Sequence, residues 1–305
     1  MPQTKREIQA MLEAAGIRPN RRLGQSFLID GNLMRKLVES AEIPRDAVVL
    51  EVGSGTGSLT EMLLERARHV VAVEIDPGLQ EIVAGRLGER PNLTLLRGDA
   101  LANKNRLAPE LIDAVRTAAG GSAFVMLVAN LPFQIASPLL ANLVLGGLGV
   151  RRMCFTVQTE VADRIASPPG RKSYGPLSIT LQAFCDVRTI ARLAPSVFWP
   201  VPSVASTMLR LDYSPVKASR IVDPEGFVRV VRACFTHRRK KLAHALEYLF
   251  GGRRGDVPPE LTAFETDRRP EELTVEEWIG LAHRVLSLGP EGLGPWELDE
   301  DPAED

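Results

Sequence analysis

The sequence predicts an α/β protein, with a doubly wound and mostly parallel sheet followed by a small all-helical C-terminal domain. Short, continuous apolar runs alternate with helical patterns over residues 47–145. This alternation is typical of parallel strands that helices cover on both faces. Beyond residue 224 the helical patterns continue without intervening strands. At 305 residues the chain is long enough for two such domains.

The first half of the chain contains the repeated strand and helix patterns. Helical spacing predicts helices over residues 4–15 and 32–41, and the arginine-rich segment between them has no clear period, so we expect a loop. The next elements are expected, in chain order, as a strand at 47–52, a helix at 59–67, a strand at 70–75, a helix at 79–87, a strand at 93–96, a helix at 106–118 and a strand at 123–129. Strands and helices at this spacing predict a Rossmann-like sheet.

The second half is predicted to complete the sheet and then to become helical. The patterns indicate a helix at 137–145, a strand at 152–157, a short helix at 160–165, a loop at 167–175, a further element at 177–186, a strand at 207–211 and helices at 227–235, 241–250 and 275–286. The composition shifts near Ser214-Pro215. We therefore divide the chain into a sheet domain at 1–213, a helical domain at 214–288 and an acidic tail at 289–305 that we expect to be disordered.

The composition excludes several classes of protein. Hydrophobic residues make up 45% and charged residues 25% of the chain, as in ordinary globular proteins. No apolar run approaches the roughly 18 residues that span a bilayer, and the charged N-terminus lacks the apolar stretch of a secretory signal. Three dispersed cysteines and four histidines lack metal-ligand spacing. We expect a cytoplasmic protein with reduced thiols and no metal or membrane partner.

The net charge of −1 conceals an uneven distribution of charge. Residues 1–36 hold seven Lys/Arg against three Asp/Glu, residues 210–254 hold eleven against four, and the segment from 255 onward holds three against fifteen. Concentrated basic segments often bind nucleic acid or acidic partners, although a solvated surface remains the alternative. The residues expected to contact nucleic acid are Arg18, Arg21, Arg22, Arg171, Lys172, Arg238, Arg239, Lys240 and Lys241.

Successive strand ends carry residues suited to a nucleoside. The turn Gly53-x-Gly55-x-Gly57 lets the backbone approach a ligand closely. Its spacing is neither the P-loop nor the dinucleotide fingerprint, which favours a nucleoside over a bound pyrophosphate. Glu74 ends the second strand, where an acid can accept hydrogen bonds from ribose hydroxyls. Asp99 ends the third and can receive the amine of an adenine ring. Together these residues predict a ligand that contains adenosine.

The stretch Asn130-Leu131-Pro132-Phe133 follows the fourth strand. Pro132 keeps Leu131 out of the helical region and removes a backbone donor, so this corner should be rigid and extended. Open α/β sheets bind ligands at the carboxyl ends of their strands. We therefore expect an amide, free carbonyl groups and an aromatic ring at the same site as the glycine turn.

This stretch is similar to the Asn/Asp-Pro-Pro-Tyr/Phe signature of enzymes that methylate amino groups with S-adenosylmethionine. The further motifs occur in the expected order: Leu23-Gly-Gln-Ser-Phe-Leu28, Glu51-Val-Gly-Ser-Gly-Thr-Gly57, Glu74-Ile-Asp76, Gly98-Asp-Ala100 and Phe198-x-Pro-x-Pro-Ser-Val204. From about Arg21 to Leu249, the chain resembles the small-subunit ribosomal RNA adenine dimethyltransferases.

The resemblance implies methyl transfer from S-adenosylmethionine to the N6 amines of two adjacent adenosines near the 3' end of small-subunit ribosomal RNA. The donor-binding residues would be Gln25, Ser26, Leu28, Gly53, Gly55, Glu74, Ile75, Asp99, Ala100 and Asn130. The catalytic residues would be Asn130, Leu131, Pro132 and Phe133. The partner would be the RNA or a pre-assembled small subunit, and we expect a monomer. The chain has Ser26 where the family usually has Asn, and Phe133 where it usually has Tyr.

Three alternatives remain open at this level. A dehydrogenase could use Glu74 for the ribose of NAD, although the glycine spacing and the Asn-Leu-Pro-Phe corner disfavour it. A large-subunit or DNA adenine methyltransferase would share the motifs, but the basic helical domain and Phe198-x-Pro-x-Pro-Ser-Val204 favour the small subunit. A non-catalytic RNA-binding assembly factor would keep the fold, but intact Glu74, Asp99 and Asn130 disfavour it.

Overall fold

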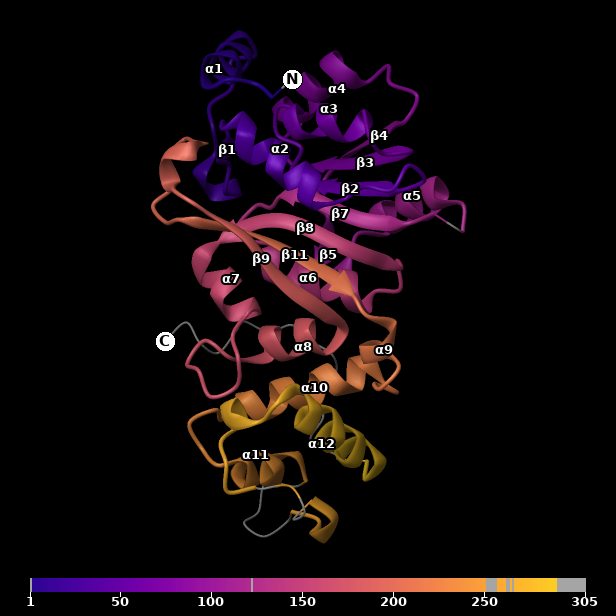
Figure 1. Cartoon of the computed structure of the whole chain (residues 1–305), viewed down its shortest axis with the longest axis vertical. Helices are drawn as coiled ribbons and strands as arrows, with labels where there is room; N and C mark the ends of the chain where they lie inside the picture. The colour runs from indigo at the N-terminus through magenta and orange to yellow at the C-terminus, as the bar shows by residue number, and fades with distance from the viewer. Residues whose placement is uncertain (1, 122, 251–256, 262–263, 265, 290–305) are drawn as a thin grey trace. The chain divides into compact units, whose positions relative to one another are not determined.

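The structure is a computed structural model that describes residues 2–121, 123–250, 257–261, 264 and 266–289 (Figure 1). The chain forms two compact units, the first comprising Met1–Ala162 with Val187–Tyr213 and the second Asp163–Asp186 with Ser214–Asp305. The second unit thus includes a segment, 163–186, that we had placed in the sheet domain. The expected disordered tail lies outside the described residues, apart from Gly289.

The first unit contains a seven-stranded sheet with the order β4-β3-β2-β7-β8-β11-β9. Its strands are β2 (Val48–Val52), β3 (His69–Glu74), β4 (Leu93–Arg97), β7 (Val125–Asn130), β8 (Val150–Gln158), β9 (Cys185–Leu193) and β11 (Ser206–Tyr213). The five strands from β4 to β8 in this order are parallel, and β11 is antiparallel to β8. The predicted mostly parallel, doubly wound sheet is confirmed. Sequence analysis did not predict β9, which is largely polar and only partly buried.

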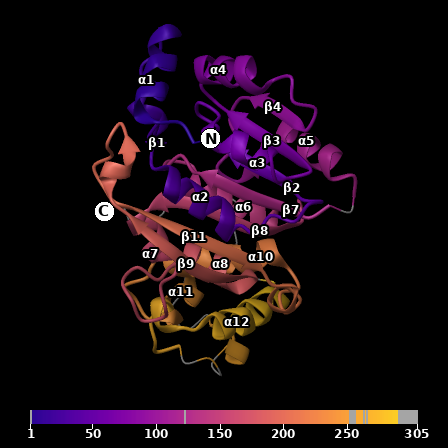
Figure 2. The same cartoon turned by 45° about the horizontal axis from the view of Figure 1, so that its top comes forward.

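Helices cover both faces of the sheet (Figures 1 and 2). On one face, α2 (Gly31–Ser40), α3 (Ser58–Leu64) and α4 (Pro77–Leu87) share a core cluster with alternate residues of the strands, such as Val49 and Met126. The neighbours of these residues point to the opposite face. There α5 (Pro109–Ala119) contacts β2, β3 and β4, and α6 (Ala136–Leu145) contacts β8.

The strand order creates a topological switch point between β2 and β7. From β2 the chain proceeds through β3 to β4 on one side, and it then returns to β7 on the other side of β2. Ligands bind beyond the carboxyl ends of strands at such a point, because the two flanking connections leave in opposite directions. Gly53 follows β2 directly, and Asn130 is the last residue of β7. The fold therefore brings the glycine turn and the Asn130 corner together.

The N-terminal segment contains a strand where we expected only a loop. β1 (Phe27–Leu28) pairs antiparallel with β10 (Phe198–Trp199), a pairing that no local pattern indicates. Ile8 and Leu12 of α1 (Lys5–Ala14) pack in a cluster with Phe27 and Leu79. The remaining short elements of this unit are η1 (Arg21–Leu23), β5 (Leu101–Asn103), β6 (Arg106–Leu107) and η2 (Pro195–Val197).

The second unit is helical in its described residues. Its elements are α8 (Pro176–Phe184), α9 (Pro215–Ala218), α10 (Pro224–Phe235), α11 (Leu242–Leu249), η3 (Pro259–Leu261), η4 (Pro270–Glu272) and α12 (Val275–Ser287), while α7 (Thr159–Ile165) crosses the boundary between the units. α10 contacts α8, α11 and α12, around buried Phe235 and Trp278. In neither unit does the described chain contain a helix long and apolar enough to cross a membrane.

Candidate active site

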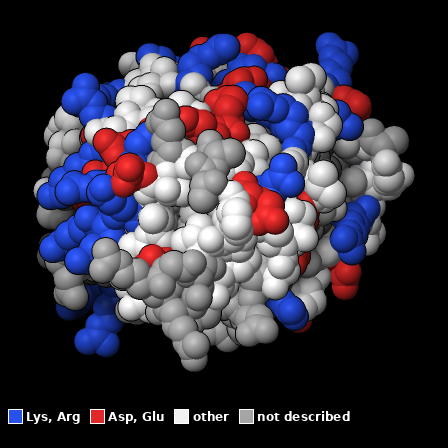
Figure 3. Space-filling view, turned by 90° about the horizontal axis from the view of Figure 1, so that it is seen from below, with Lys and Arg blue, Asp and Glu red and all other residues white. Residues whose placement is uncertain are grey.

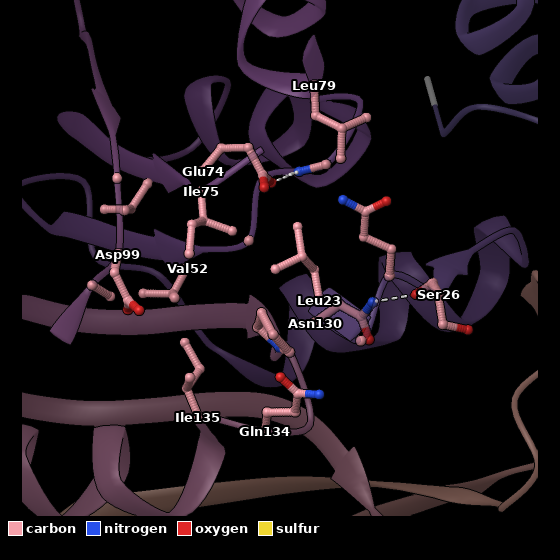
Figure 4. Close-up of a pocket in the computed structure, with 18 of the residues that line it drawn as sticks. Leu23, Ser26, Val52, Glu74, Ile75, Leu79, Asp99, Asn130, Gln134 and Ile135 are labelled. Carbon is pink, nitrogen blue, oxygen red and sulfur yellow. Dashed lines mark hydrogen bonds between the residues drawn. The ribbon is translucent and has the colours of Figure 1, made fainter. Parts of the chain in front are cut away.

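A cleft opens at the switch point of the first unit (Figure 4). It has about 800 Å³ of space that protein atoms do not fill, part of it open to solvent. The predicted site residues that line it are Gln25, Ser26, Gly53, Gly55, Glu74, Ile75, Asp99, Ala100, Asn130 and Pro132.

The glycine turn packs directly against neighbouring parts of the cleft. Gly53 and Gly55 have φ angles of 82° and 58°, in the region that L side chains rarely adopt. A Cβ atom on Gly53 would lie 3.0 Å from Cγ of Pro132, and one on Gly55 would lie 3.0 Å from Cε1 of Phe27. Both the backbone angles and the neighbours therefore require glycine.

Glu74 presents a carboxylate to the cleft from the end of β3. Its Oε2 accepts a hydrogen bond from the Gly55 N–H at 2.8 Å, and its Oε1 accepts one from the Asp76 N–H at 3.0 Å. Burial raises the pKa of the Glu74 carboxyl, whereas these backbone donors lower it. A carboxylate has about four acceptor positions. The backbone donors therefore leave acceptor capacity for a hydroxyl group of a ligand.

Asp99 provides a second carboxylate, after the end of β4. Its Oδ1 accepts a hydrogen bond from the Leu101 N–H at 2.9 Å, and its side chain is exposed. Figure 4 shows the apolar side chains of Ile75 and Ile135 in the same cleft. The combination of apolar walls and an acceptor suits the faces and the exocyclic amine of an adenine ring.

Gln25 and Ser26 connect the N-terminal segment to the cleft. Gln25 accepts a hydrogen bond from the Asn20 N–H at 2.6 Å and donates through Nε2 to Oδ2 of Asp76 at 2.8 Å. The Ser26 hydroxyl donates to the Pro200 carbonyl at 2.8 Å. Because that hydroxyl has one hydrogen, it can offer a ligand only an acceptor while it makes this bond.

The side chain of Asn130 is held from two sides. Its Nδ2 donates to the Ser26 carbonyl at 2.9 Å, as Figure 4 shows, and its Oδ1 accepts a hydrogen bond from the Thr156 hydroxyl. The Thr156 carbonyl accepts from the Leu131 N–H at 3.2 Å. Since an amide oxygen has two lone pairs, Oδ1 of Asn130 keeps one. The Leu131 carbonyl accepts no hydrogen bond from the described part of the chain.

Thr156 is a site residue that sequence analysis missed. It lies fully buried on β8, opposite Asn130 in the register of β7 and β8. No motif includes it, and only this register could have pointed to it. Sequence analysis also missed Gln134 and Ile135 in the cleft lining, although they directly follow the predicted corner.

Three predicted residues do not have side chains in the cleft lining. Leu28 belongs to the core cluster, and the side chain of Leu131 is buried. Leu131 could therefore act only through its backbone carbonyl. Phe133 is half-buried and follows Pro132 outside the lining. Its ring belongs to the corner rather than to the cleft itself.

The charges of the cleft select against a polyphosphate ligand. Glu74 and Asp99 are its charged residues, and no Lys, Arg or His occurs among the described residues that line it. Below the turn, burial raises the pKa of the Glu51 carboxyl to about 8, and its Oε2 has no hydrogen-bond partner among the described atoms. Within the described residues, no group of three His, Cys, Asp or Glu side chains could hold a metal ion.

The predicted nucleic-acid-binding residues occur in both units. In the first unit, Arg18 and Arg22 are exposed, and the side chain of Arg21 is outside what the structure describes. In the second unit, Arg238 donates to the Lys172 carbonyl at 2.7 Å and pairs with Glu271 at 3.0 Å. This bond joins the two basic segments at 171–172 and 238–241. Figure 3 shows Lys and Arg side chains gathered along one side of the face in view.

The fold is of the doubly wound α/β class, and its cleft lies at the switch point, where proteins of this class bind their ligands. Residues 16–284 match the family described as ribosomal RNA adenine dimethylase. The chain belongs to this family, as the resemblance of its motifs predicted.

Curated relatives agree with this family over almost the whole chain. A protein of Clostridium acetobutylicum named ribosomal RNA small subunit methyltransferase A is 34% identical over 90% of this chain and 96% of its own length. A protein of the same name from Geobacillus kaustophilus is 38% identical over 93% of this chain and 97% of its own length.

Two solved structures share the fold. A dimethyladenosine transferase from Plasmodium falciparum has a TM-score of 0.70 at 23% identity, covering 86% of this chain and 98% of its own. The 23S rRNA methyltransferase ErmE has a TM-score of 0.60 at 23% identity, and the match covers 85% of this chain and 99% of that one. At this identity the two likenesses establish the architecture alone.

Proposed function

We propose that this chain transfers methyl groups from S-adenosylmethionine to the N6 amines of two adjacent adenosines near the 3' end of small-subunit ribosomal RNA, dimethylating each. The observation that carries the proposal is the cleft, where Glu74, Asp99 and Asn130 lie at the carboxyl ends of β3, β4 and β7 and no basic residue occurs among the described lining residues. The relatives' name, ribosomal RNA small subunit methyltransferase A, supports the small subunit as substrate. The large-subunit alternative shares the fold, which does not by itself identify a substrate.

The cleft suits the donor in shape and charge. S-adenosylmethionine supplies an electrophilic methyl group on a positively charged sulfonium. Glu74 would accept hydrogen bonds from its ribose hydroxyls, and Asp99 would accept from its adenine amine. Gly53 and Gly55 would let the backbone approach it. The carboxylates favour a cationic ligand, whereas the pyrophosphate of NAD would meet two negative charges and no basic side chain of the lining.

The corner after β7 would bind the adenosine that is methylated. The free lone pair of Asn130 Oδ1 and the carbonyl of Leu131 would accept the two N–H bonds of N6 and direct its lone pair towards the methyl group. Phe133 would stack on the base, which must leave its own stack to enter the site, a contact worth roughly 1–3 kcal/mol. No strong base is required, because the N6 protons become acidic as the new bond forms. Orientation and electrostatics would supply the rate.

The RNA backbone would be bound by exposed cations of both units, which makes binding depend on salt. The proposed residues are Arg18, Arg21, Arg22, Arg171, Lys172, Arg238, Arg239, Lys240 and Lys241. We further propose that the protein acts in the cytoplasm as a monomer, on ribosomal RNA or on a pre-assembled small subunit.

The decisive experiment incubates the protein, in separate reactions, with unmethylated small subunits and with large subunits, using donor labelled in its methyl group. The modified bases are then mapped, and binding to each subunit is measured by co-sedimentation. We expect label on two adjacent adenosines near the 3' end. Label on large-subunit RNA would support the alternative substrate, and binding without label would support an assembly factor without catalysis. Protection against thermal unfolding by S-adenosylmethionine, but not by NAD, would exclude the dehydrogenase.

The stacking role of Phe133 has its own test. Phe133→Ala should lose methyl transfer, while Phe133→Tyr should retain it because the ring face is kept. Initial rates on the same small subunits measure both variants. An equal loss in the two variants would contradict stacking.

A further inference from the structure

Three aromatic rings form a cluster at the surface of the second unit. His237 follows α10, and His244 and Tyr248 are four residues apart on α11, which places them on one face of that helix. The ring centroids of His237 and Tyr248 are 4.5 Å apart, with 33° between the planes. His244 lies 5.5 Å from His237 and 5.2 Å from Tyr248, with its ring steeply inclined to both.

This ring cluster is distinct from the aromatic core of the unit. Phe235 and Trp278 pack together and are fully buried. Tyr248, in contrast, keeps 53% of its surface exposed, and His244 keeps 40% of its side chain exposed. A single exposed ring needs no explanation. Three contacting rings that remain partly accessible offer apolar ring faces with polar atoms at their edges, of the kind that binds planar groups.

Unpaired cations flank the ring cluster. Arg239 and Lys240 are exposed in the turn between His237 and α11, and neither pairs with a carboxylate among the described residues. The neighbouring Lys241 pairs with Asp267 at 2.6 Å, but both side chains are largely exposed, and such pairs contribute little. These positions would bind an anionic chain rather than a neutral one.

Two further groups define the charge around the rings. Through the bond from Arg238 to the Lys172 carbonyl, the exposed Arg171 and Lys172 adjoin the same turn. The acidic neighbour is Glu247, whose Oε2 lies 3.5 Å from Nδ1 of His244. Among the described residues named here, the six cations of the segments 171–172 and 238–241 outnumber three carboxylates, Glu247, Asp267 and Glu271, and the last two pair with Lys241 and Arg238. The surface is complementary to a polyanion that also carries planar groups.

We propose that His237, His244 and Tyr248 form a stacking site for an unpaired nucleobase of RNA, while Arg239 and Lys240 bind phosphates of the same strand. Bases present a π-face that stacks on aromatic side chains whatever their sequence, and basic grooves follow the backbone. Proteins read RNA mainly at such unstacked loops and bulges. The inference rests on the proposed function, since that function makes ribosomal RNA the substrate. An acidic peptide would use the cations but would not require the rings.

The test compares Tyr248→Ala with Tyr248→Phe in the full-length protein. The probes are a short RNA hairpin with an unpaired loop and a fully paired RNA duplex of equal length, with affinities measured by fluorescence anisotropy. Tyr248→Ala should weaken hairpin binding by roughly tenfold and leave duplex binding unchanged, whereas Tyr248→Phe should match the wild type. Equal losses for hairpin and duplex, or no loss for the hairpin, would overturn the proposal.

Two controls separate this proposal from misfolding and from the proposed function. Thermal unfolding of each variant identifies a folding defect, and His237→Gln, which removes a different ring, should reproduce the selective loss for the hairpin. A polyglutamate peptide that displaces the hairpin as well as RNA does would overturn the proposal. Methyl transfer by wild-type protein to small subunits is measured separately. Its absence would refute the function, while a selective loss in hairpin binding would still establish the stacking site.

Discussion

The cleft of the first unit and the ring cluster of the second unit use charge in opposite ways. The cleft combines two carboxylates with apolar walls, and Glu74 is only 5% exposed. The ring cluster is flanked by Arg239 and Lys240, which are exposed to water. Electrostatic interactions are stronger where water is excluded and weaker where salt can screen them. The cleft therefore suits one small cation, and the surface suits a long polyanion held by many weak contacts.

This contrast predicts different responses to substitution. A change in the cleft removes a group that no solvent molecule replaces, so its effect should be large and insensitive to salt. A change on the surface removes one of several similar contacts, so its effect should be small and depend on salt. The following variants test this difference, beginning with the largest expected effect.

Asn130→Ala should lower the rate of methyl transfer by about 10²- to 10³-fold, a typical loss when an oriented polar group of an active site is removed. The donor affinity should stay within a few-fold of the wild type, because Glu74 and Asp99 remain. Single-turnover rates on small subunits and donor calorimetry measure the two quantities. Turnover at the wild-type rate would refute the assignment of the corner as the acceptor site.

Glu74→Gln should weaken donor binding by about 10- to 100-fold, because hydrogen bonds to a charged group contribute about 1.5–3 kcal/mol. Calorimetric titration with S-adenosylmethionine measures the loss. Glu81→Gln, which makes the same charge change at an exposed position of α4, is the matched control and should bind as the wild type does. Equal affinities for the two variants would remove Glu74 from the site.

Thr156→Val should reduce methyl transfer by roughly tenfold with unchanged donor affinity. It removes the hydroxyl that orients Asn130 Oδ1 while keeping the buried volume, and such a hydrogen bond is worth about 1 kcal/mol. Thr156→Ser restores the hydroxyl and should recover the rate. If serine fails to rescue, packing rather than orientation is the role of Thr156.

The substitution Glu51→Gln should change how the free energy of unfolding depends on pH. Burial raises the pKa of Glu51 to about 8 in the folded protein. Below the unfolded pKa of about 4.3, Glu51 is protonated in both states and its contribution to the free energy of unfolding is fully present. That contribution is lost as the pH rises through the folded pKa. The variant should therefore gain relative to the wild type by up to about 1.4 kcal/mol per pH unit within this window.

Urea unfolding of both proteins at several pH values between about 5 and 8 measures this difference without donor present. If the free energies of unfolding of the variant and the wild type differ by the same amount at every pH in this range, Glu51 titrates near its ordinary pKa. The same measurement on Glu81→Gln provides a control for a general effect of removing one acid.

Replacing both Arg239 and Lys240 with glutamine should have the smallest effect, a few-fold loss of affinity for duplex RNA near physiological salt. The dependence of log affinity on log salt should become shallower by about one for each phosphate contact removed. Donor affinity should not change. An unchanged salt dependence would indicate that these exposed cations are solvated surface and do not bind RNA.

The sequence by itself determined much of the first unit. Apolar runs and helical spacing predicted β2, β3, β4, β7, β8 and the helices between them, because these patterns arise from local burial. The motifs also predicted that Gly53, Glu74, Asp99 and Asn130 would share one site. Parallel strands present their carboxyl ends at one edge, so residues at those ends converge whatever the details of packing.

Only the tertiary structure decided which partners these groups have. The hydrogen bonds from Thr156 to Asn130 and from Ser26 to Pro200 join segments far apart in the chain, and their formation depends on strand register. The pairing of β1 with β10 and the strand β9 likewise lack a local pattern. The ring cluster forms only because a turn returns His237 to the face of α11. Local periodicity encodes burial, whereas contacts between distant segments depend on the completed fold.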